Sequence, residues 1–134
     1  MNKSEILEKL KEYNFNSDEY VVISSAALVI LGIKEETKDI DISVTPKYYK
    51  YLEENYDCEL EKYDDKNDVN IYYIDGVINF GTNYYSDLPY DFVIISGIRV
   101  QSIDAITNLK TMLNRPKDIK DLELIKNYLK SRDT

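Results

Sequence analysis

The sequence predicts an α/β (α+β) fold in one domain: a small mixed β-sheet flanked by helices, with a helical pair at the C-terminal end. Three observations predict it. The run at 20–24 is almost entirely apolar, as in a central strand. The stretch at 39–44 begins with aspartates alternating with isoleucines, as in a strand with one buried face. Two amphipathic stretches follow, at 103–113 and 117–130. With 134 residues, positions 1–134 fit one domain that can bury its own core.

The first third of the chain is predicted to form a helix, a strand and a second helix. Residues 4–13 carry apolar side chains at helical spacing, which indicates an amphipathic helix. The strand at 20–24 leads into a helix over 26–31. Ser25 is expected to cap that helix by accepting a hydrogen bond from a free backbone N–H. Gly32 then supplies its C-terminal stop.

The middle of the chain continues with the strand at 39–44. Thr45 is an N-cap residue, and Pro46 suits the first position of a helix. We therefore expect a helix over 47–54, followed by a short strand over 58–63.

A β-hairpin is predicted around Asp75-Gly76, the strongest short-range signal for a two-residue turn. Strands at 70–74 and 77–80 flank the turn. Counting outward from it, Ile74 should lie opposite Val77, and Tyr72 opposite Asn79. The turn explains Asp75, so we do not assign that residue to catalysis.

The last part of the chain begins with a polar loop at 82–89. Strands at 90–95 and 98–101 are expected around the turn Ser96-Gly97, and Ser102 should cap the helix that follows. A final helix opens after Asn114-Arg115-Pro116. The inward faces of these two helices are predicted to carry Ile103, Ile106, Leu109 and Leu113 in the first, and Ile119, Leu122, Ile125 and Leu129 in the second.

The composition excludes several chemistries. The chain has no histidine, so it can hold neither a Ser-His-Asp triad nor a histidine-ligated zinc ion. Cys58 is the only cysteine, so no internal disulfide forms. With no basic segment ahead of an apolar stretch near the start, a secretory signal is not expected. No apolar run reaches the roughly 20 residues of a membrane span. A cytoplasmic location follows as the expectation.

The charge is strongly negative and unevenly distributed. The net charge is −8. Residues 107–134 carry seven Lys/Arg and four Asp/Glu, a balance of +3, and the remaining residues carry −11. Contacts with nucleic-acid phosphates need clustered cations, so we expect no general DNA binding. The basic segment also fits ordinary solvated helix faces.

Asp39 and Asp41 are the candidate metal ligands. Residues two apart in a strand point to the same face, so the two carboxylates should lie side by side. Oxygen ligands on a rigid strand suit a hard divalent cation such as Mg²⁺. An ordinary half-exposed strand would show the same alternation.

These residues belong to a longer pattern. Ser24-Ser25 at a strand-to-helix turn, followed by the paired acids in Thr37–Ile42, resembles the nucleotidyltransferase superfamily with the DNA polymerase β-like fold. Lys110, the segment 115–118 and Asp121 match its Lys…Arg-x-Lys-Asp-x-x-Asp pattern. The chain looks in particular like small bacterial members of the kind found near abortive-infection and toxin–antitoxin systems.

The resemblance implies a function. In that family Mg²⁺ assists the transfer of NMP from an NTP to a hydroxyl acceptor, here RNA, protein or a small molecule. It implies that Asp39 and Asp41 hold the metal. It also implies nucleotide-binding roles for Ser24, Ser25, Lys110 and Arg115. From the residues alone, Lys110 could equally be a solvated helix lysine.

Asn79 departs from the family pattern. The resembled proteins have a third carboxylate at the matching position, and an amide carries no charge and cannot act as a base. Asp68 is a remote candidate for compensation. A second hypothesis follows: a catalytically degenerate descendant that binds a nucleotide or a partner, in an antitoxin-like or regulatory role.

Overall fold

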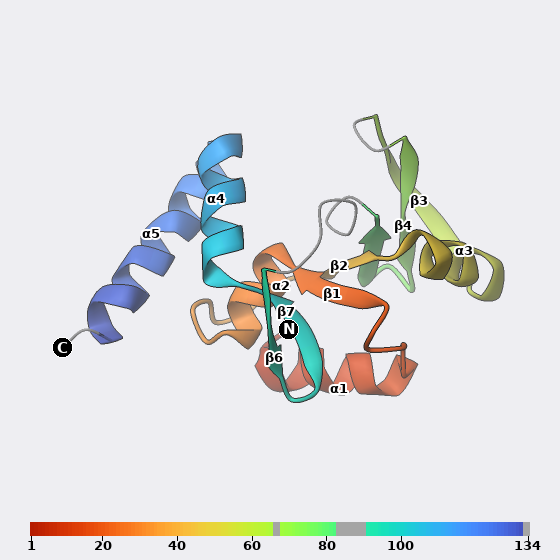
Figure 1. Cartoon of the computed structure of the whole chain (residues 1–134), viewed down its shortest axis with the longest axis horizontal. Helices are drawn as coiled ribbons and strands as arrows, with labels where there is room; N and C mark the ends of the chain where they lie inside the picture. Colours follow the sequence, from red (N-terminus) through yellow and green to blue (C-terminus); the bar gives the residue numbers. More distant parts are fainter. Residues whose placement is uncertain (66–67, 83–90, 133–134) are drawn as a thin grey trace.

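The computed structural model describes residues 1–65, 68–82 and 91–132. These residues contain five helices and seven strands (Figure 1). The helices are α1 (Lys3–Tyr13), α2 (Ser24–Ile30), α3 (Pro46–Asn55), α4 (Ile103–Leu113) and α5 (Pro116–Arg132). The strands are β1 (Tyr20–Ile23), β2 (Ile40–Val44), β3 (Cys58–Asp64), β4 (Val69–Ile74), β5 (Ile78–Gly81), β6 (Phe92–Ile95) and β7 (Ile98–Gln101).

The strands form one mixed sheet in the order β3-β4-β5-β2-β1-β7-β6. The pairs β2–β5 and β1–β7 are parallel, and the other neighbours are antiparallel. The hydrophobic strand β1 lies near the middle, with β2 beside it, as its apolar sequence predicts. The predicted fold class is confirmed: a mixed sheet flanked by helices, with α4 and α5 as a helical pair at one end (Figure 1).

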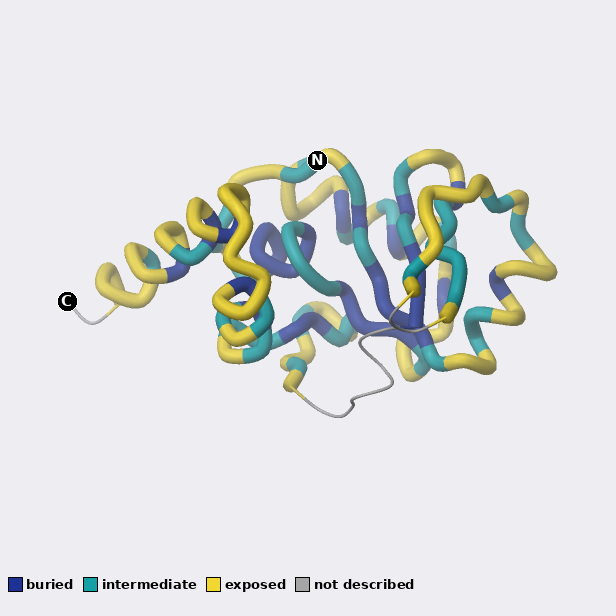
Figure 2. Tube along the Cα trace, turned by 90° about the horizontal axis from the view of Figure 1, so that it is seen from above, coloured by how far each residue is buried: buried dark blue, intermediate teal, exposed yellow. Residues whose placement is uncertain are grey.

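The two faces of the sheet differ in character. Alternate residues of a strand point to opposite faces. One set of positions packs with α1, α2 and α3 into a single hydrophobic core. In Figure 2 many of the buried residues lie in the central strands. The sheet residues of this core include Tyr20, Val22, Ile40, Ile42, Val44, Ile74, Ile78 and Phe80. The intervening positions, Asp41 among them, lie on the other face.

Local sequence signals fix most helix ends. Asn2 and Glu5 form a capping box at the start of α1. Thr45 caps α3 by accepting a hydrogen bond from the N–H of Tyr48. Ser102 caps α4 in the same way, as expected. Gly32 has φ +83° directly after the C-cap of α2, and the next N–H bonds back to the carbonyl of Leu28. This is a Schellman ending, which confirms the predicted stop.

Ser25 does not cap α2, contrary to the prediction. The helix begins one residue earlier than the expected cap, at Ser24, and its N-cap residue is Ile23, which makes no side-chain capping hydrogen bond. Ser25 therefore lies within the first turn, where its hydroxyl is available to other partners.

The hairpin register is shifted by one residue from the prediction. Asp75 and Gly76 both have positive φ and form the expected turn. Ile74, however, is the partner of Ile78, because Val77 is an extra residue whose carbonyl accepts a hydrogen bond from Ile40 on β2. As a result Tyr73, and not Tyr72, lies opposite Asn79.

The inward faces of the last two helices also differ from the prediction. In α5, Ile119 and Leu129 are 52% and 43% exposed. Ile125 is buried as predicted, and the other buried residues of this helix are Asp118 and Asp121. In α4, Ile106 is buried as predicted, Lys110 is buried as well, and Leu113 is exposed. The two helices pack on each other, and the ion pairs of Lys110 with Asp118 and Asp121 are buried in that contact, so the apolar stripe alone does not set their orientation.

The remaining expectations fall at the ends of the described segments. The loop predicted at 82–89 lies outside the described residues except for Thr82, and the strand predicted from residue 90 begins at Phe92. No helix among residues 1–65, 68–82 and 91–132 combines the length and hydrophobicity that crossing a membrane requires.

Candidate nucleotide and cation site

Three predicted residues come together on the face of the sheet away from the hydrophobic core. Asp41 on β2 is the register partner of Asn79 on the parallel strand β5. Asn79 is in turn the partner of Tyr73 on β4. Side chains at paired positions share a face, so Asp41, Asn79 and Tyr73 form one row. Asp39 precedes β2 by one residue and stands two positions before Asp41.

The row lies next to the start of α2. Asp41 is also the partner of Ile23, the last residue of β1, on its other side. The chain turns directly after Ile23 into Ser24 and Ser25. The strand-to-helix turn therefore begins directly after Ile23, the residue opposite Asp41. As a result, the predicted acids and the predicted serines lie in one region.

Asp41 is in an environment that disfavours its charge. Burial is the main cause, and the neighbouring charges of Asp39 and Glu61 add to it, so that the pKa of Asp41 is raised to about 6. The ammonium groups of Lys117 and Lys62 act in the opposite direction. A bound divalent cation would offset this gathering of negative charge.

Asp39 is held by a tyrosine that the sequence interpretation did not select. The hydroxyl of Tyr73 donates a hydrogen bond to Oδ2 of Asp39 at 3.3 Å. Burial raises the pKa of Tyr73, so this hydroxyl stays protonated and acts as a donor. The shifted hairpin register is what places Tyr73 here.

Asn79 makes its contact with a different acid. Its side-chain Nδ2 donates a hydrogen bond to Oε2 of Glu61 on β3. Asp68, the remote candidate for compensation, instead accepts a hydrogen bond from Tyr63 near the turn between β3 and β4. Among the described residues, Glu61 is therefore the acidic residue that forms a hydrogen bond with the Asn79 side chain.

The start of α2 has an unusual backbone. Ser24 has φ +59°, a left-handed conformation that glycine adopts more easily than serine. Its N–H donates to Oε1 of Gln101, a buried side chain on β7, at 3.0 Å. This bond offsets part of the conformational cost at Ser24, and it explains how a serine is accommodated at the turn.

Ser25 has a cationic neighbour. The Nζ atom of Lys34 lies 3.3 Å from Oγ of Ser25 and 3.3 Å from Oδ1 of Asp121 on α5. The Lys34 side chain is 30% exposed. A partly exposed ammonium group at the start of α2 can attract phosphate, so Lys34 is a candidate ligand-binding residue that the sequence interpretation missed.

Lys110 is engaged in a buried ion-pair cluster. Its Nζ lies 3.0 Å from Asp121 and 3.4 Å from Asp118, and only 5% of its side chain is exposed. Asp121 carries the cluster on to Lys34, so the charges link α4 and α5 to the start of α2. In this structure Lys110 contacts two carboxylates, and Lys34 rather than Lys110 contacts Ser25.

Arg115 closes the other end of the cluster. Its Nε and Nη2 atoms donate to the two carboxylate oxygens of Asp118, at 2.6 and 3.1 Å. Hydrogen bonds from Arg115 are the main reason why the pKa of Asp118 lies well below its usual range. Arg115 and Asp118 therefore form an ion pair at the start of the last helix. The guanidinium side chain remains 45% exposed.

The donors fit Mg²⁺ in kind. Mg²⁺ is usually bound by one or two carboxylates, with waters and phosphate oxygens completing its coordination. Asp39 and Asp41 supply two carboxylates on one face of the sheet. Within the described part of the chain, no three Asp, Glu or Cys side chains gather closely enough to hold a metal ion by themselves.

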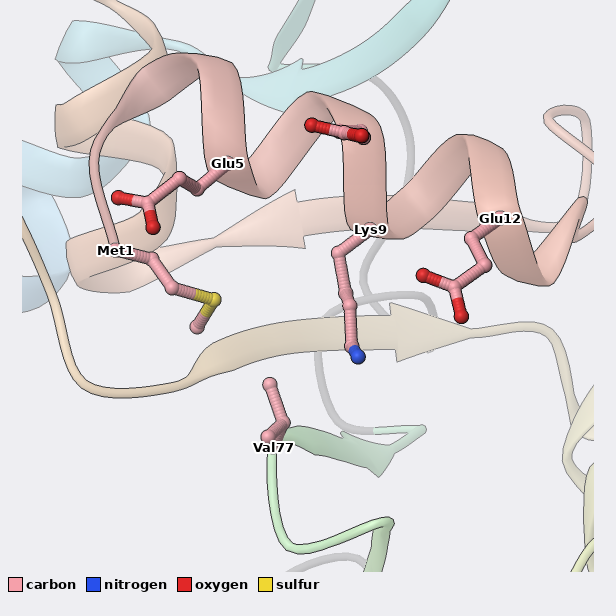
Figure 3. A pocket seen from close by; sticks show the side chains of 6 residues that line it. Met1, Glu5, Lys9, Glu12 and Val77 are labelled. Carbon is pink, nitrogen blue, oxygen red and sulfur yellow. The ribbon is translucent and has the colours of Figure 1, made fainter.

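A shallow depression elsewhere on the surface is not this site. It has a volume of about 320 Å³ and lies between α1 and the start of β5. In Figure 3, Lys9 extends from α1 toward Val77, with Glu5 and Glu12 nearby on the same helix. None of the predicted site residues lines it, so we assign it no part in binding the nucleotide.

Two solved structures resemble this chain over nearly its whole length. One is ANT(2")-Ia in complex with adenylyl-2"-tobramycin: TM-score 0.59, 18% identity, 96% of this chain and 87% of that chain. The other is a candidate nucleotidyltransferase from Thermotoga maritima: TM-score 0.58, 19% identity, 98% of this chain and 96% of that chain. The chain has the nucleotidyltransferase fold. No model of a protein family and no curated protein matches the sequence.

Within the nucleotidyltransferase fold, the sequence identified the residues whose position depends on local structure. Asp39 and Asp41 follow from strand periodicity, and Ser24-Ser25 from the end of an apolar strand. Tyr73, Glu61 and Lys34 depend on register shifts and on contacts between distant segments. An apolar-to-acid alternation in 58–63 was the only sequence signal for Glu61, and Lys34 had none.

Proposed function

We propose that the protein is a Mg²⁺-dependent nucleotidyltransferase that moves NMP from an NTP to a hydroxyl acceptor. The observation that carries this proposal is the placement of Asp39 and Asp41 beside the turn into α2. Asp41 is the register partner of Ile23, and Ser24 follows directly. Two carboxylates and a strand-to-helix turn in one region can bring a cation and phosphate groups together. The nucleotidyltransferase fold supports the same reading.

Several residues of the chain have distinct roles in this proposal. Asp39 and Asp41 would hold the cation, with Tyr73 orienting Asp39 through its hydroxyl. Mg²⁺ bound there supplies positive charge against the phosphates of the nucleotide. Ser24 and Ser25 form the phosphate side of the site, with Lys34 beside them.

Lys110 and Arg115 enter the proposal in different ways. Lys110 is buried between two carboxylates and contributes by anchoring Asp121, which in turn holds Lys34. Arg115 keeps part of its guanidinium exposed while two of its nitrogens hold Asp118. Its remaining N–H groups are donors that a phosphate could accept from.

The acceptor that fits best is small. The net charge of −8 disfavours a long nucleic acid, because its phosphates would be repelled over most of the surface. The compound bound to ANT(2")-Ia carries an adenylyl group on tobramycin, which is a small acceptor. A protein or a short RNA hydroxyl stays an alternative acceptor, and we place the reaction in the bacterial cytoplasm.

A second candidate function rests on Asn79. Without a carboxylate at this position the chain could bind a nucleotide, or a partner protein as antitoxin-like regulators do, with weak or no transfer. The left-handed Ser24 points the same way, because its side chain limits how closely a phosphate can approach the backbone.

A titration separates the two candidates. NTPs are titrated with Mg²⁺ into the wild type, Asp39→Asn and Asn79→Asp by calorimetry, and transfer to small hydroxyl acceptors is followed by mass spectrometry. A Mg²⁺-dependent affinity that Asp39→Asn abolishes, with turnover in the wild type, supports the enzyme. If the wild type binds NTP without turnover, and Asn79→Asp restores turnover, the result supports the degenerate form. Equal, Mg²⁺-independent binding by all three proteins would contradict the site.

A further inference from the structure

We infer that Gln101 is a positioning residue for nucleotide binding: its buried amide holds the turn at Ser24 in the left-handed conformation that sets the two serines beside Asp41. The inference rests on the proposed function, because it concerns the phosphate side of the same site. Only 1% of Gln101 is exposed, so it acts through the backbone of Ser24 and not by touching a ligand.

Strand β7 brings Gln101 to the turn. It runs parallel to β1, with Val100 opposite Val22. Gln101 follows Val100, so it stands level with the end of β1, where the chain turns into Ser24. Its Oε1 accepts a hydrogen bond from the N–H of Ser24 at 3.0 Å, between residues 77 positions apart in the sequence. The turn is therefore tied to a neighbouring strand of the sheet.

Ser24 has a conformation that needs such a tie. Its φ of +59° lies in the left-handed region, which is costly for a residue with a side chain and easy for glycine. The hydrogen bond to Gln101 is available to the N–H in this conformation. Without that acceptor, a serine at this position would gain from returning to a common backbone conformation. The amide of Gln101 is thus what makes the observed turn favourable.

The conformation of Ser24 decides where the phosphate side of the site lies. Ile23 is fixed opposite Asp41 by strand pairing, so Ser24 is the first residue beyond this pair that can redirect the chain. The next residue, Ser25, has its Oγ 3.3 Å from Nζ of Lys34. A change at Ser24 would move Ser25 and disturb this contact, while Asp41 stays in place. The amide contact thus controls the phosphate side without altering the cation side.

Four variants test the inference. Gln101→Met removes the acceptor and keeps the length of the side chain. Gln101→Glu keeps an acceptor oxygen at the same place, because a carboxyl group buried this deeply stays protonated. Ser24→Gly removes the conformational cost of positive φ. Ile6→Val, a change in the core beneath α1, is the control for a loss of stability alone.

Two kinds of binding are measured for each variant and for Gln101→Met combined with Ser24→Gly. Calorimetry gives the Kd of a non-hydrolysable ATP analogue with Mg²⁺. Electron paramagnetic resonance gives the affinity for Mn²⁺ alone. Urea unfolding of the same proteins separates changes in stability from changes in binding.

We expect Gln101→Met to raise the Kd of the analogue about tenfold, the effect of one lost hydrogen bond. Gln101→Glu and Ile6→Val should bind as the wild type does, and Ser24→Gly at least as tightly. In the glycine background, Gln101→Met should cost about threefold or less, because the two residues act on one turn. The affinity for Mn²⁺ should be the same in all of these proteins.

A purely structural role for Gln101 would lower the urea midpoint of Gln101→Met and leave its Kd unchanged. That result, or an equal loss of affinity in the serine and glycine backgrounds, would overturn the inference and leave the proposed function standing. If Gln101→Met does not fold, the combined variant decides. Binding close to that of Ser24→Gly supports the inference, and an undiminished loss or a failure to fold overturns it.

Failure of the proposed function gives a different result. In that case the wild type and Asp39→Asn bind the analogue equally in the presence of Mg²⁺, or neither binds it. The inference about Gln101 would then fall with the site that it serves.

Discussion

Asp41 and Ile23 are register partners in the antiparallel pair of β1 and β2. This single pairing joins the two halves of the candidate site, because Ile23 ends the strand that turns into Ser24 and Ser25. The acids are thus fixed against the helix start by the backbone of two central strands. Backbone pairing of this kind holds a site more firmly than loops do.

Asp41→Asn should stabilise the protein at neutral pH in the absence of divalent cations. Burial and like charges raise the pKa of Asp41 to about 6, above its unfolded value near 3.9. As the pH rises from about 4 to 6, the unfolded chain releases this proton and the folded protein keeps it, so stability falls over that window and stays low above it. We expect a gain of about 2 kcal/mol at pH 7.5.

The measurement is urea denaturation with EDTA at pH 7.5 and pH 4. The gain should shrink to a small fraction at pH 4, where Asp41 is protonated in the folded state and about half protonated in the unfolded chain. Glu54→Gln, an exposed change of the same kind on α3, should show no gain at either pH. A gain of equal size at both pH values would argue against a charge effect.

Lys110→Met should destabilise the protein strongly. The substitution leaves Asp118 and Asp121 buried with less positive charge, and removing one partner of a buried ion pair costs about 3 kcal/mol. Thermal or urea unfolding measures the loss. Lys120→Met, on the exposed side of α5, should unfold like the wild type. Similar stability of both variants would show that the cluster is not structural.

The low pKa of Asp118 should make the stability of the protein sensitive to acid. Arg115 holds the pKa of Asp118 well below its usual range. Its stabilising effect is therefore complete above about pH 4, the unfolded pKa, and is lost as the pH falls toward the folded value. The urea midpoint of the wild type should fall between pH 5 and pH 2. Asp118→Asn should flatten this dependence, while Asp104→Asn, a change at an exposed acid of α4, should keep it.

Lys34→Ala should weaken nucleotide binding without unfolding the protein. The Lys34 ammonium group stands beside Ser25 and is partly exposed, so it can meet a phosphate oxygen. We expect the Kd for a Mg·NTP to rise about tenfold, the effect of one charge-assisted hydrogen bond. Calorimetry checks this, with Lys47→Ala on α3 as the control. Equal affinities in the two variants would remove Lys34 from the site.

How much the sequence could predict depends on the range of the interactions involved. Thr45, Ser102 and Gly32 act on their own helix ends, and the structure has each as expected. The predicted hairpin register was wrong because Val77 is an extra residue whose carbonyl accepts a hydrogen bond from β2, a contact that no local pattern encodes. The exposure of Ile119 has a similar cause, since buried charges on α4 and α5 decide how that pair packs.

The candidate site divides in the same way. Asp39 and Asp41 could be selected because a strand places alternate residues on one face. Glu61 escaped selection because its contact with Asn79 forms only when β3, β4 and β5 assemble in the sheet, and Lys34 because it meets Ser25 and Asp121 only after folding. Ser25 was misassigned as a cap because the helix starts at Ser24.

The most direct test of the account is a crystal structure of the protein grown with Mg²⁺ and a non-hydrolysable NTP analogue. We predict a cation between the carboxylates of Asp39 and Asp41, with the phosphates of the analogue at the turn of Ser24 and Ser25. A nucleotide bound elsewhere, or a cation that neither aspartate coordinates, would contradict the proposed function.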